Sequence, residues 1–199
     1  MNLSFYYLVT NKKLQGVIYN EGIAVLIAVS KRCGAKATLQ LLDLADVEAG
    51  VDINQDADIH AIGFSSLQFP LARRLIKKVH GGKKTGSKIV VGGIHATVDP
   101  ESVLALPEVD VVVAGEGEKA IEWLLAQPGI SPEDCTVPNM FFRKASPKPL
   151  QKSKYVDLNE LPFPDRSLFP QEELRQRPEF IFSRGCPFSC SYCANEFLN

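Results

Sequence analysis

Three cysteines lie close together in the stretch Cys186-Pro-Phe-Ser-Cys190-Ser-Tyr-Cys193. At this CxxxCxxC spacing one short loop can present three thiolates to a common point. Thiolates are soft, charged ligands that suit iron–sulfur clusters. A cubane cluster held by three cysteines keeps its fourth iron open for another ligand. The spacing therefore favours a [4Fe–4S] cluster bound by Cys186, Cys190 and Cys193.

Two other interpretations of these cysteines stay open. Half of a zinc site could use this spacing, although no His or Cys follows Cys193 to complete four ligands. A disulfide framework suits short secreted chains, whereas residues 1–9 lack the basic segment and long apolar core of a signal peptide. The other two cysteines, Cys33 and Cys135, have no ligand partners at suitable spacing, and we expect them to be bystanders.

Small and polar residues gather directly after three successive apolar runs. They form the strings Ser65-Ser66-Leu67, Gly92-Gly93-Ile94-His95 and Gly115-Glu116-Gly117-Glu118. Glycines let a bulky ligand approach the backbone because no Cβ is in the way, and serine hydroxyls can hydrogen-bond a polar ring. Such glycines can also simply form tight turns, but three clusters in a row favour a ligand site. We expect Thr10 and Asn11, after the first apolar run, to belong to it.

The elements that must position these residues alternate along the first 127 residues. Asp99 and Gly34 stand where an N-cap and a C-terminal cap belong. The apolar runs lack clean alternation, which indicates strands buried on both faces of a parallel sheet. We therefore predict a flavodoxin-like (Rossmann-type), doubly wound, five-stranded parallel sheet, in which ligands bind at the carboxyl ends of the strands. The expected strands are 3–9, 38–44, 59–64, 88–91 and 109–114, and the expected helices are 22–33, 70–80, 100–106 and 118–125.

The sequence changes character after residue 127. Residues 128–178 are rich in proline and are predicted to form a linker, in which 139–143 and 150–152 could pair as a small hairpin. Residues 180–183 (FIFS) are predicted to form a strand that leads directly into the cysteine loop. We therefore expect a first domain at 1–127 and the beginning of a second at 179–199.

The strings after the third and fourth strands resemble a known family. Ser65-Ser66-Leu67 and Gly92-Gly93 match the Ser-x-Leu and Gly-Gly strings of cobalamin (B12)-binding domains. The resemblance implies that the dimethylbenzimidazole tail of cobalamin enters a slot between these loops, with the corrin across the strand ends. It assigns the cofactor-binding role to residues 1–127.

The cysteine motif resembles that of the radical S-adenosylmethionine (SAM) superfamily, and Ser183-Arg184-Gly185 and Tyr192 fit the same pattern. The resemblance implies that the reduced cluster cleaves SAM to a 5′-deoxyadenosyl radical, with Tyr192 near the adenine of SAM. That radical would abstract hydrogen from an unactivated carbon, and cobalamin would deliver a methyl group or take part in a cyclisation. The strings Gly92-Gly93-Ile94-His95 and Gly115-Glu116-Gly117-Glu118 look like the cobalamin domains that are fused to radical SAM domains.

His60, His95 and Glu116 lie in or next to the strings that resemble those of cobalamin-binding domains. Residues 58–63 (DIHAIG) match the Asp-x-His-x-x-Gly string whose histidine binds cobalt from below in other B12 proteins. Here the string abuts Ser65, so we expect His60 to be a buried or edge residue inside the third strand, and the cobalt to have no protein histidine beneath it. His95 could contact the corrin edge or be a surface loop residue. Glu116 could hydrogen-bond the nucleotide tail or be a solvated turn carboxylate.

Composition excludes some partners. A net charge of −1 gives no electrostatic footprint for nucleic acid, and no stretch approaches the roughly 20 apolar residues of a membrane span. Five cysteines, three of them clustered, argue for a reducing compartment, so we expect a cytoplasmic protein. The resemblance implies an electron donor such as flavodoxin or ferredoxin and a small-molecule or lipid-like substrate that the sequence does not identify.

A radical SAM barrel extends far beyond its cysteine motif, whereas six residues follow Cys193 here. We therefore expect the chain to be cut from a longer protein or to come from a truncated gene, and to bind cobalamin without turning over. Two alternatives are a cobalamin carrier or sensor module and a nucleotide-binding flavodoxin-like enzyme. The second lacks any G-x-G-x-x-G or P-loop string after the first strand.

Overall fold

The computed structural model describes residues 1–10, 12, 19–127, 129, 131–143, 145, 151, 156–176, 178–188, 190, 191 and 193. Within them a six-stranded sheet has the order β2-β1-β3-β4-β5-β6. The first five strands run parallel, and β6 pairs with β5 in the antiparallel direction. The strands are β1 (Asn2–Leu8), β2 (Lys36–Leu42), β3 (Ile59–Gly63), β4 (Lys88–Gly92), β5 (Val111–Val113) and β6 (Met140–Phe142).

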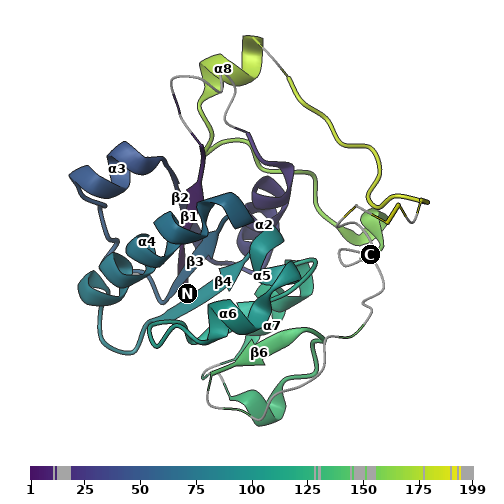
Figure 1. Ribbon diagram of the computed structural model, residues 1–199. Coiled ribbons are helices and arrows are strands. Elements are labelled where there is room, and N and C mark those ends of the chain that lie inside the picture. Colours follow the sequence, from purple (N-terminus) through teal and green to yellow (C-terminus); the bar gives the residue numbers. More distant parts are fainter. Residues whose placement is uncertain are drawn as a thin grey trace.

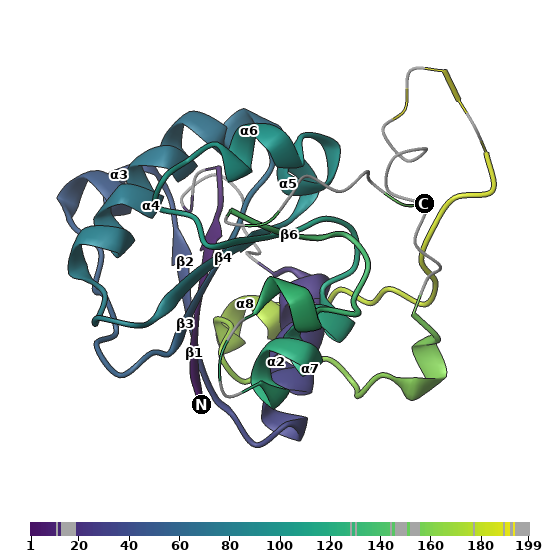
Figure 2. The same cartoon turned by 90° about the horizontal axis from the view of Figure 1, so that it is seen from below.

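Helices cover both faces of this sheet. Figure 2 shows α3, α4, α5 and α6 on one face and α2, α7 and α8 on the other. The side chains between the layers form two separate apolar cores, one on each face. The helices are α2 (Glu21–Arg32), α3 (Leu44–Ala49), α4 (Phe69–Gly82), α5 (Ile94–Val98), α6 (Pro100–Leu104), α7 (Glu118–Ala126) and α8 (Gln171–Gln176).

Local sequence accounts for the helix boundaries and the buried faces. Asn20 caps α2 by accepting the backbone N–H of Ile23, and Asp99 caps α6 in the same way from Ser102. Gly34, just past α2, has a φ of 77°, as a glycine after a helix C-terminus often does. Helix α4 buries one apolar stripe: Ala72, Leu75, Ile76 and Val79.

The sequence-based fold class is confirmed, but the sheet has one strand more than the five expected. Residues 140–142 do form a strand, yet they pair with β5 and close the edge of the main sheet (Figure 1). An uncovered β5 would expose unpaired backbone groups, which explains why β6 pairs there. The expected partner residues 150 and 152 lie outside the described residues. Gln151 is not in a strand, and its backbone exchanges hydrogen bonds with the Asn139 side chain.

Two further details differ from expectation. Residues 180–183 form no strand; Phe180 and Phe182 are exposed there, and no described strand pairs with them. Helices α3, α5 and α8 were not expected, because each is six residues or shorter and carries too little periodic pattern to be recognised. The domain limits at residues 127 and 178 stay a prediction.

None of the helices in the described part of the chain combines the length and apolar character needed to cross a membrane.

Candidate functional site

A pocket of about 360 Å³ opens at the carboxyl ends of β1, β3, β4 and β5 and extends between α2 and α7. The chain leaves β1 for β2 on one side of the sheet and continues with β3 on the other, so the pocket lies at the point where the strand order reverses. Doubly wound sheets bind their ligands at this point.

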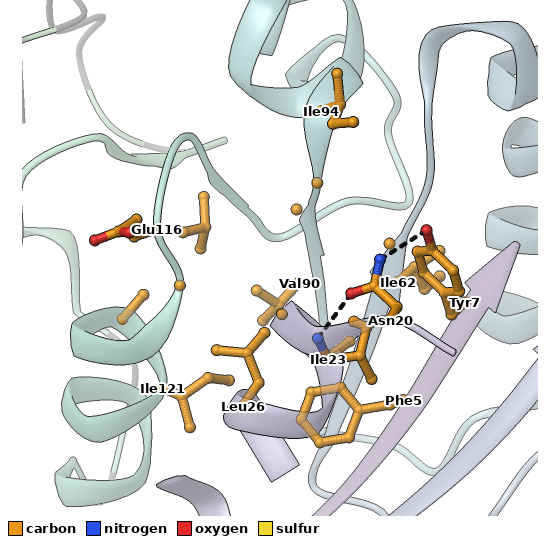
Figure 3. Close-up of a pocket in the computed structure, with 18 of the residues that line it drawn as sticks. Phe5, Tyr7, Asn20, Ile23, Leu26, Ile62, Val90, Ile94, Glu116 and Ile121 are labelled. Carbon is orange, nitrogen blue, oxygen red and sulfur yellow. Dashed lines mark hydrogen bonds between the residues drawn. The ribbon is translucent and has the colours of Figure 1, made fainter. Parts of the chain in front are cut away.

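The wall of the pocket is apolar. Figure 3 shows Leu26 of α2 and Ile121 of α7 pointing toward Val90 of the sheet, with Phe5 and Ile23 beside them. Binding pockets for organic ligands combine such a wall with a few placed polar groups. This part of the pocket suits a flat, apolar ring.

The first polar group of the pocket is the pair Tyr7 and Asn20 (Figure 3). The Asn20 side chain accepts the Ile23 backbone N–H at 2.9 Å through its oxygen and donates through Nδ2 to the Tyr7 hydroxyl at 2.9 Å. Burial raises the pKa of Tyr7, against the smaller effect of the Asn20 hydrogen bond. Tyr7 therefore keeps its proton and can donate it to a ligand acceptor.

The glycines of the pocket differ in what requires them. Gly93 has a φ of 97°, and a Cβ there would lie 2.9 Å from the Phe64 carbonyl oxygen, so the fold itself needs glycine. A Cβ on Gly92 would meet only the Val113 carbonyl oxygen at 3.6 Å, an ordinary contact. Since the protein leaves room for a side chain at Gly92, the space there is available to a ligand.

The second polar group of the pocket is a cluster of three charged side chains at its rim, Glu116, Glu118 and Arg184. Arg184 Nη1 lies 2.8 Å from Glu116 Oε1 and 2.7 Å from Glu118 Oε1. Burial acts to lower the pKa of Arg184, but the two carboxylates together raise it. The guanidinium is therefore firmly charged.

Some of the sequence-predicted residues line this pocket and others do not. Thr10, Ser66, Leu67 and His95 do not line it, and Leu67 is 95% exposed. Asn11 and Tyr192 lie outside the described residues. The role of each residue as a ligand contact stays a prediction. The predicted residues that do line the pocket are Ser65, Gly92, Gly93, Gly115, Glu116 and Gly117.

Ser65 fixes the loop after β3 through Gln68. Its hydroxyl donates to Gln68 Oε1 at 2.9 Å, and Gln68 Nε2 donates to the Leu8 carbonyl at the end of β1. The loop that follows β3 is thereby joined to the end of the neighbouring strand, which helps to set the shape of the pocket mouth.

His95 is not the surface loop residue that the sequence allowed. It lies in α5 and is buried, with Nδ1 3.1 Å from the Ser66 hydroxyl and Nε2 3.3 Å from that of Ser102. Its ring packs 4.2 Å from that of Phe69. The positive φ of Gly93 lets the chain turn directly into α5, which carries His95 inward.

His60 lies inside β3 and is fully buried, as expected. Its Nδ1 is 3.2 Å from the Tyr6 hydroxyl, and its Nε2 has no hydrogen-bond partner in the described part of the chain. Burial, with smaller effects from Lys83 and Lys84, lowers the pKa of His60 to about 4. His60 does not line the pocket.

The cysteine loop is described only in part. Cys190 is exposed, Cys186 and Cys193 are half-buried, and the Cys193 N–H donates to the Cys190 carbonyl at 2.9 Å. No three His, Cys, Asp or Glu side chains gather as a metal site among the described residues. The assignment of the three cysteines to a cluster therefore stays a prediction.

Sequence reasoning missed part of the pocket. Phe5, Tyr7 and Leu26 belong to elements that were predicted, but which face they present depends on the packing of α2 against the sheet. Arg184 is 68 residues from Glu116 in the chain, and no sequence pattern links the two. Asn20 carried a usable signal, because it stands before a predicted helix.

The chain is similar to known proteins over the part that forms this pocket. The family model "B12 binding domain" matches residues 7–125, more than half of the chain. Bacteriochlorophyllide d C-8(2)-methyltransferase of Chlorobaculum tepidum is 26% identical over 153 residues, which are 76% of this chain and 32% of that protein. 2-(S-pantetheinyl)-carbapenam-3-carboxylate methyltransferase of Streptantibioticus cattleyicolor is 32% identical over 132 residues, 60% of this chain and 19% of that protein. The matched region is thus a third or less of either relative.

Two solved structures share the fold. The radical SAM methyltransferase TsrM from Kitasatospora setae superposes with a TM-score of 0.51 and 17% identity, over 70% of this chain and 28% of that one. The cobalamin-dependent SAM radical enzyme OxsB, with aqua-cobalamin and SAM bound, gives a TM-score of 0.55 and 16% identity, over 87% of this chain and 25% of that one.

Proposed function

The chain belongs to the B12-binding domain family, and we propose that it is the cobalamin-binding part of a radical SAM enzyme that transfers methyl groups. The observation that carries the proposal is the apolar pocket at the carboxyl ends of four parallel strands, within the residues that match the family. The cysteine motif supports the radical SAM part of the proposal, and the names of the two methyltransferase relatives support methyl transfer.

The residues of the pocket suit the tail of cobalamin. Its flat aromatic base would pack in the apolar part, where Gly92 leaves room, and Tyr7 and Ser65 would offer hydrogen bonds. Leu67, in the turn after β3, and Ile94, the first residue of α5, are exposed, and there they would contact the apolar surface of the corrin. When bound, cobalamin supplies the chemistry of methyl transfer.

The cobalt of this cofactor would have no protein imidazole beneath it. His60 is buried inside β3, and His95 of α5 is buried against the Phe69 ring; neither lines the pocket. Electron paramagnetic resonance of the Co(II) form should therefore show no nitrogen superhyperfine splitting from a protein histidine. Splitting that disappears in a His60→Gln or His95→Gln variant would contradict this.

The cysteine loop would bind an iron–sulfur cluster and SAM. Cys186, Cys190 and Cys193 would hold a [4Fe–4S] cluster, and Tyr192 would lie near the adenine of SAM. An electron donor such as flavodoxin or ferredoxin would reduce the cluster. The substrate would be a small or lipid-like molecule with an unactivated carbon, and residues beyond those of this domain would complete its site.

Hydroxocobalamin binding tests the core of the proposal. The chain should retain hydroxocobalamin through gel filtration, with a visible absorbance change on titration. Gly92→Val should weaken binding by about tenfold or more, because the added methyl groups occupy ligand space while the fold has room for a Cβ. Gly81→Val, on the open surface of α4, is the matched control and should bind normally. No binding by the parent chain, or normal binding by Gly92→Val, would contradict the proposal.

A second candidate is a cobalamin carrier or sensor without radical chemistry, in which the three cysteines would hold no cluster. Anaerobic reconstitution with iron and sulfide distinguishes the two, since a radical SAM enzyme should gain the iron–sulfur charge-transfer absorbance and lose it on Cys190→Ala. Flavin that binds in place of cobalamin would instead indicate a nucleotide-binding enzyme of the same fold.

A further inference from the structure

Arg184 stands two residues before Cys186 and connects the cysteine loop to the pocket. Its guanidinium contacts two carboxylates, Glu116 of the connection between β5 and α7 at 2.8 Å and Glu118 at the start of α7 at 2.7 Å. All three residues line the pocket. The start of the cysteine loop is therefore attached to the rim of the pocket by charge-assisted hydrogen bonds, which are about twice as strong as neutral ones.

Burial makes these contacts expensive to lose. The side chains of Glu118, Glu116 and Arg184 are 3%, 18% and 22% exposed. Removal of the guanidinium would leave two carboxylates close together with little access to water, which is strongly unfavourable for buried charges. The second oxygen of Glu118 already has no hydrogen-bond partner in the described part of the chain. Arg184 is thus the group that neutralises this end of the pocket.

Glu116 also binds the segment before the cysteine loop. Its Oε2 accepts the Val156 backbone N–H at 2.6 Å, while its Oε1 accepts from Arg184. One carboxylate therefore joins three parts of the chain: the β5–α7 connection, the segment at residue 156 and the residue before Gly185.

A second arginine fixes the other end of the same stretch. Arg166 donates to the Glu179 carbonyl at 2.5 Å, stacks over the Phe180 ring at 4.5 Å and pairs with Glu21 at the start of α2. Residues 179–184 are thereby attached to α2 at one end and to α7 at the other. Figure 2 shows the yellow segment passing beside these helices before it continues outward.

We propose that Arg184 is a positioning residue, which holds the start of the cysteine loop at the rim of the pocket so that a group bound by the cysteines faces a ligand bound in the pocket. This role rests on the proposed function. Gly185, with a φ of 85°, turns the chain directly after Arg184 and leads into Cys186. The position of the first cysteine therefore follows from the position of the guanidinium.

Thiol labelling tests the positioning role without any cofactor. The reduced chain is treated with iodoacetamide, and the rate at each cysteine is followed by mass spectrometry. Arg184→Ala should raise the rate at Cys186 by about fivefold or more, because the loop opens from the rim. Arg184→Lys keeps one charge and should restore part of the protection. Cys33, exposed at the end of α2, is the internal reference and should not change.

Glutamate-to-glutamine variants test the role of Glu118, which pairs with Arg184. Glu118→Gln should also raise the rate at Cys186, and its effect should not add to that of Arg184→Ala. Glu122→Gln removes a carboxylate from the same helix, where it pairs with Arg32 at 2.7 Å, and should leave Cys186 unchanged. An unchanged rate at Cys186 in Arg184→Ala would overturn the proposal. An equal rise at Cys33 would overturn it too, since it would show general loosening.

Hydroxocobalamin separates this proposal from the proposed function. If the pocket takes cobalamin, saturating hydroxocobalamin should slow labelling at Cys186 in the parent chain and have less effect in Arg184→Ala. A chain that binds no hydroxocobalamin but still shows the Arg184 effect would contradict the proposed function and support the positioning role. A chain that binds it with no change at Cys186 in either form would count against the positioning role alone.

Discussion

His60 is a buried imidazole that stays neutral in the folded chain. Its folded pKa of about 4 lies below the ordinary 6.5, so the unfolded chain binds a proton at pH values where the folded chain does not. The free energy of unfolding should therefore fall as the pH drops from about 6.5 toward 4, by about 2 kcal/mol at pH 5. Above about pH 8 His60 should contribute almost no pH dependence, because neither state then binds the proton. Urea titrations between pH 4.5 and 7.5 measure this.

The matched variants isolate the effect of His60. His60→Gln should flatten the slope of unfolding free energy against pH, whatever its absolute stability. His80→Gln replaces an exposed histidine of α4 and should keep the parent slope. Equal slopes in all three proteins would show that the folded chain binds a proton at His60 as readily as the unfolded chain does, and would contradict the lowered pKa.

Gly93 illustrates a residue that the backbone itself requires. Alanine at this position would have to adopt a φ of 97° and place its Cβ 2.9 Å from the Phe64 carbonyl oxygen. Gly93→Ala should lower the free energy of unfolding by about 1–3 kcal/mol. Gly92→Ala, with its nearest contact at 3.6 Å, should change it by less than about 1 kcal/mol. Equal losses in urea denaturation would mean that the loop relaxes around either side chain.

Among the elements, the start of α2 serves both the fold and the pocket. The Asn20 oxygen caps the helix, and its Nδ2 holds the Tyr7 hydroxyl. Asn20→Ala should destabilise the chain by about 1 kcal/mol because the cap is lost. Asn20→Asp keeps an acceptor for the Ile23 N–H and should remain within about 0.5 kcal/mol of the parent, measured by thermal denaturation. A similar loss in both would show that the Tyr7 contact matters more than the cap.

The same elements show how far sequence reasoning reaches. Apolar runs and amphipathic patterns predicted all five parallel strands and the helices α2, α4 and α7, whereas the short α6 was predicted from Asp99 as an N-cap before Pro100. The glycine strings correctly marked the strand ends that form the pocket mouth. The five residues of α5 carry too little pattern to predict a helix, so neither α5 nor the burial of His95 could be predicted from the sequence. The contact from Arg184 to Glu116 could not be predicted, since long-range ion pairs depend on how distant segments pack.

The folded domain includes residues that follow its five parallel strands in the chain. The core between the sheet and α2 and α7 includes Phe142 of β6 together with Phe169 and Leu174, all from the part of the chain that the sequence suggested was a linker. The linker prediction rested on its prolines, which break regular elements but do not prevent single apolar side chains from packing. Residues after 127 therefore contribute to the stability of the pocket domain.

Phe142→Ala tests this contribution. Phe142 is buried and its ring meets that of Trp123 edge-on at 6.0 Å, so the truncation leaves a cavity between β6 and α7. The free energy of unfolding should fall by about 3 kcal/mol, and hydroxocobalamin binding should weaken at temperatures near the lowered midpoint. Phe163→Ala removes a ring that is 94% exposed and should change stability little. If both variants unfold like the parent in urea, β6 is peripheral and the domain is complete without it.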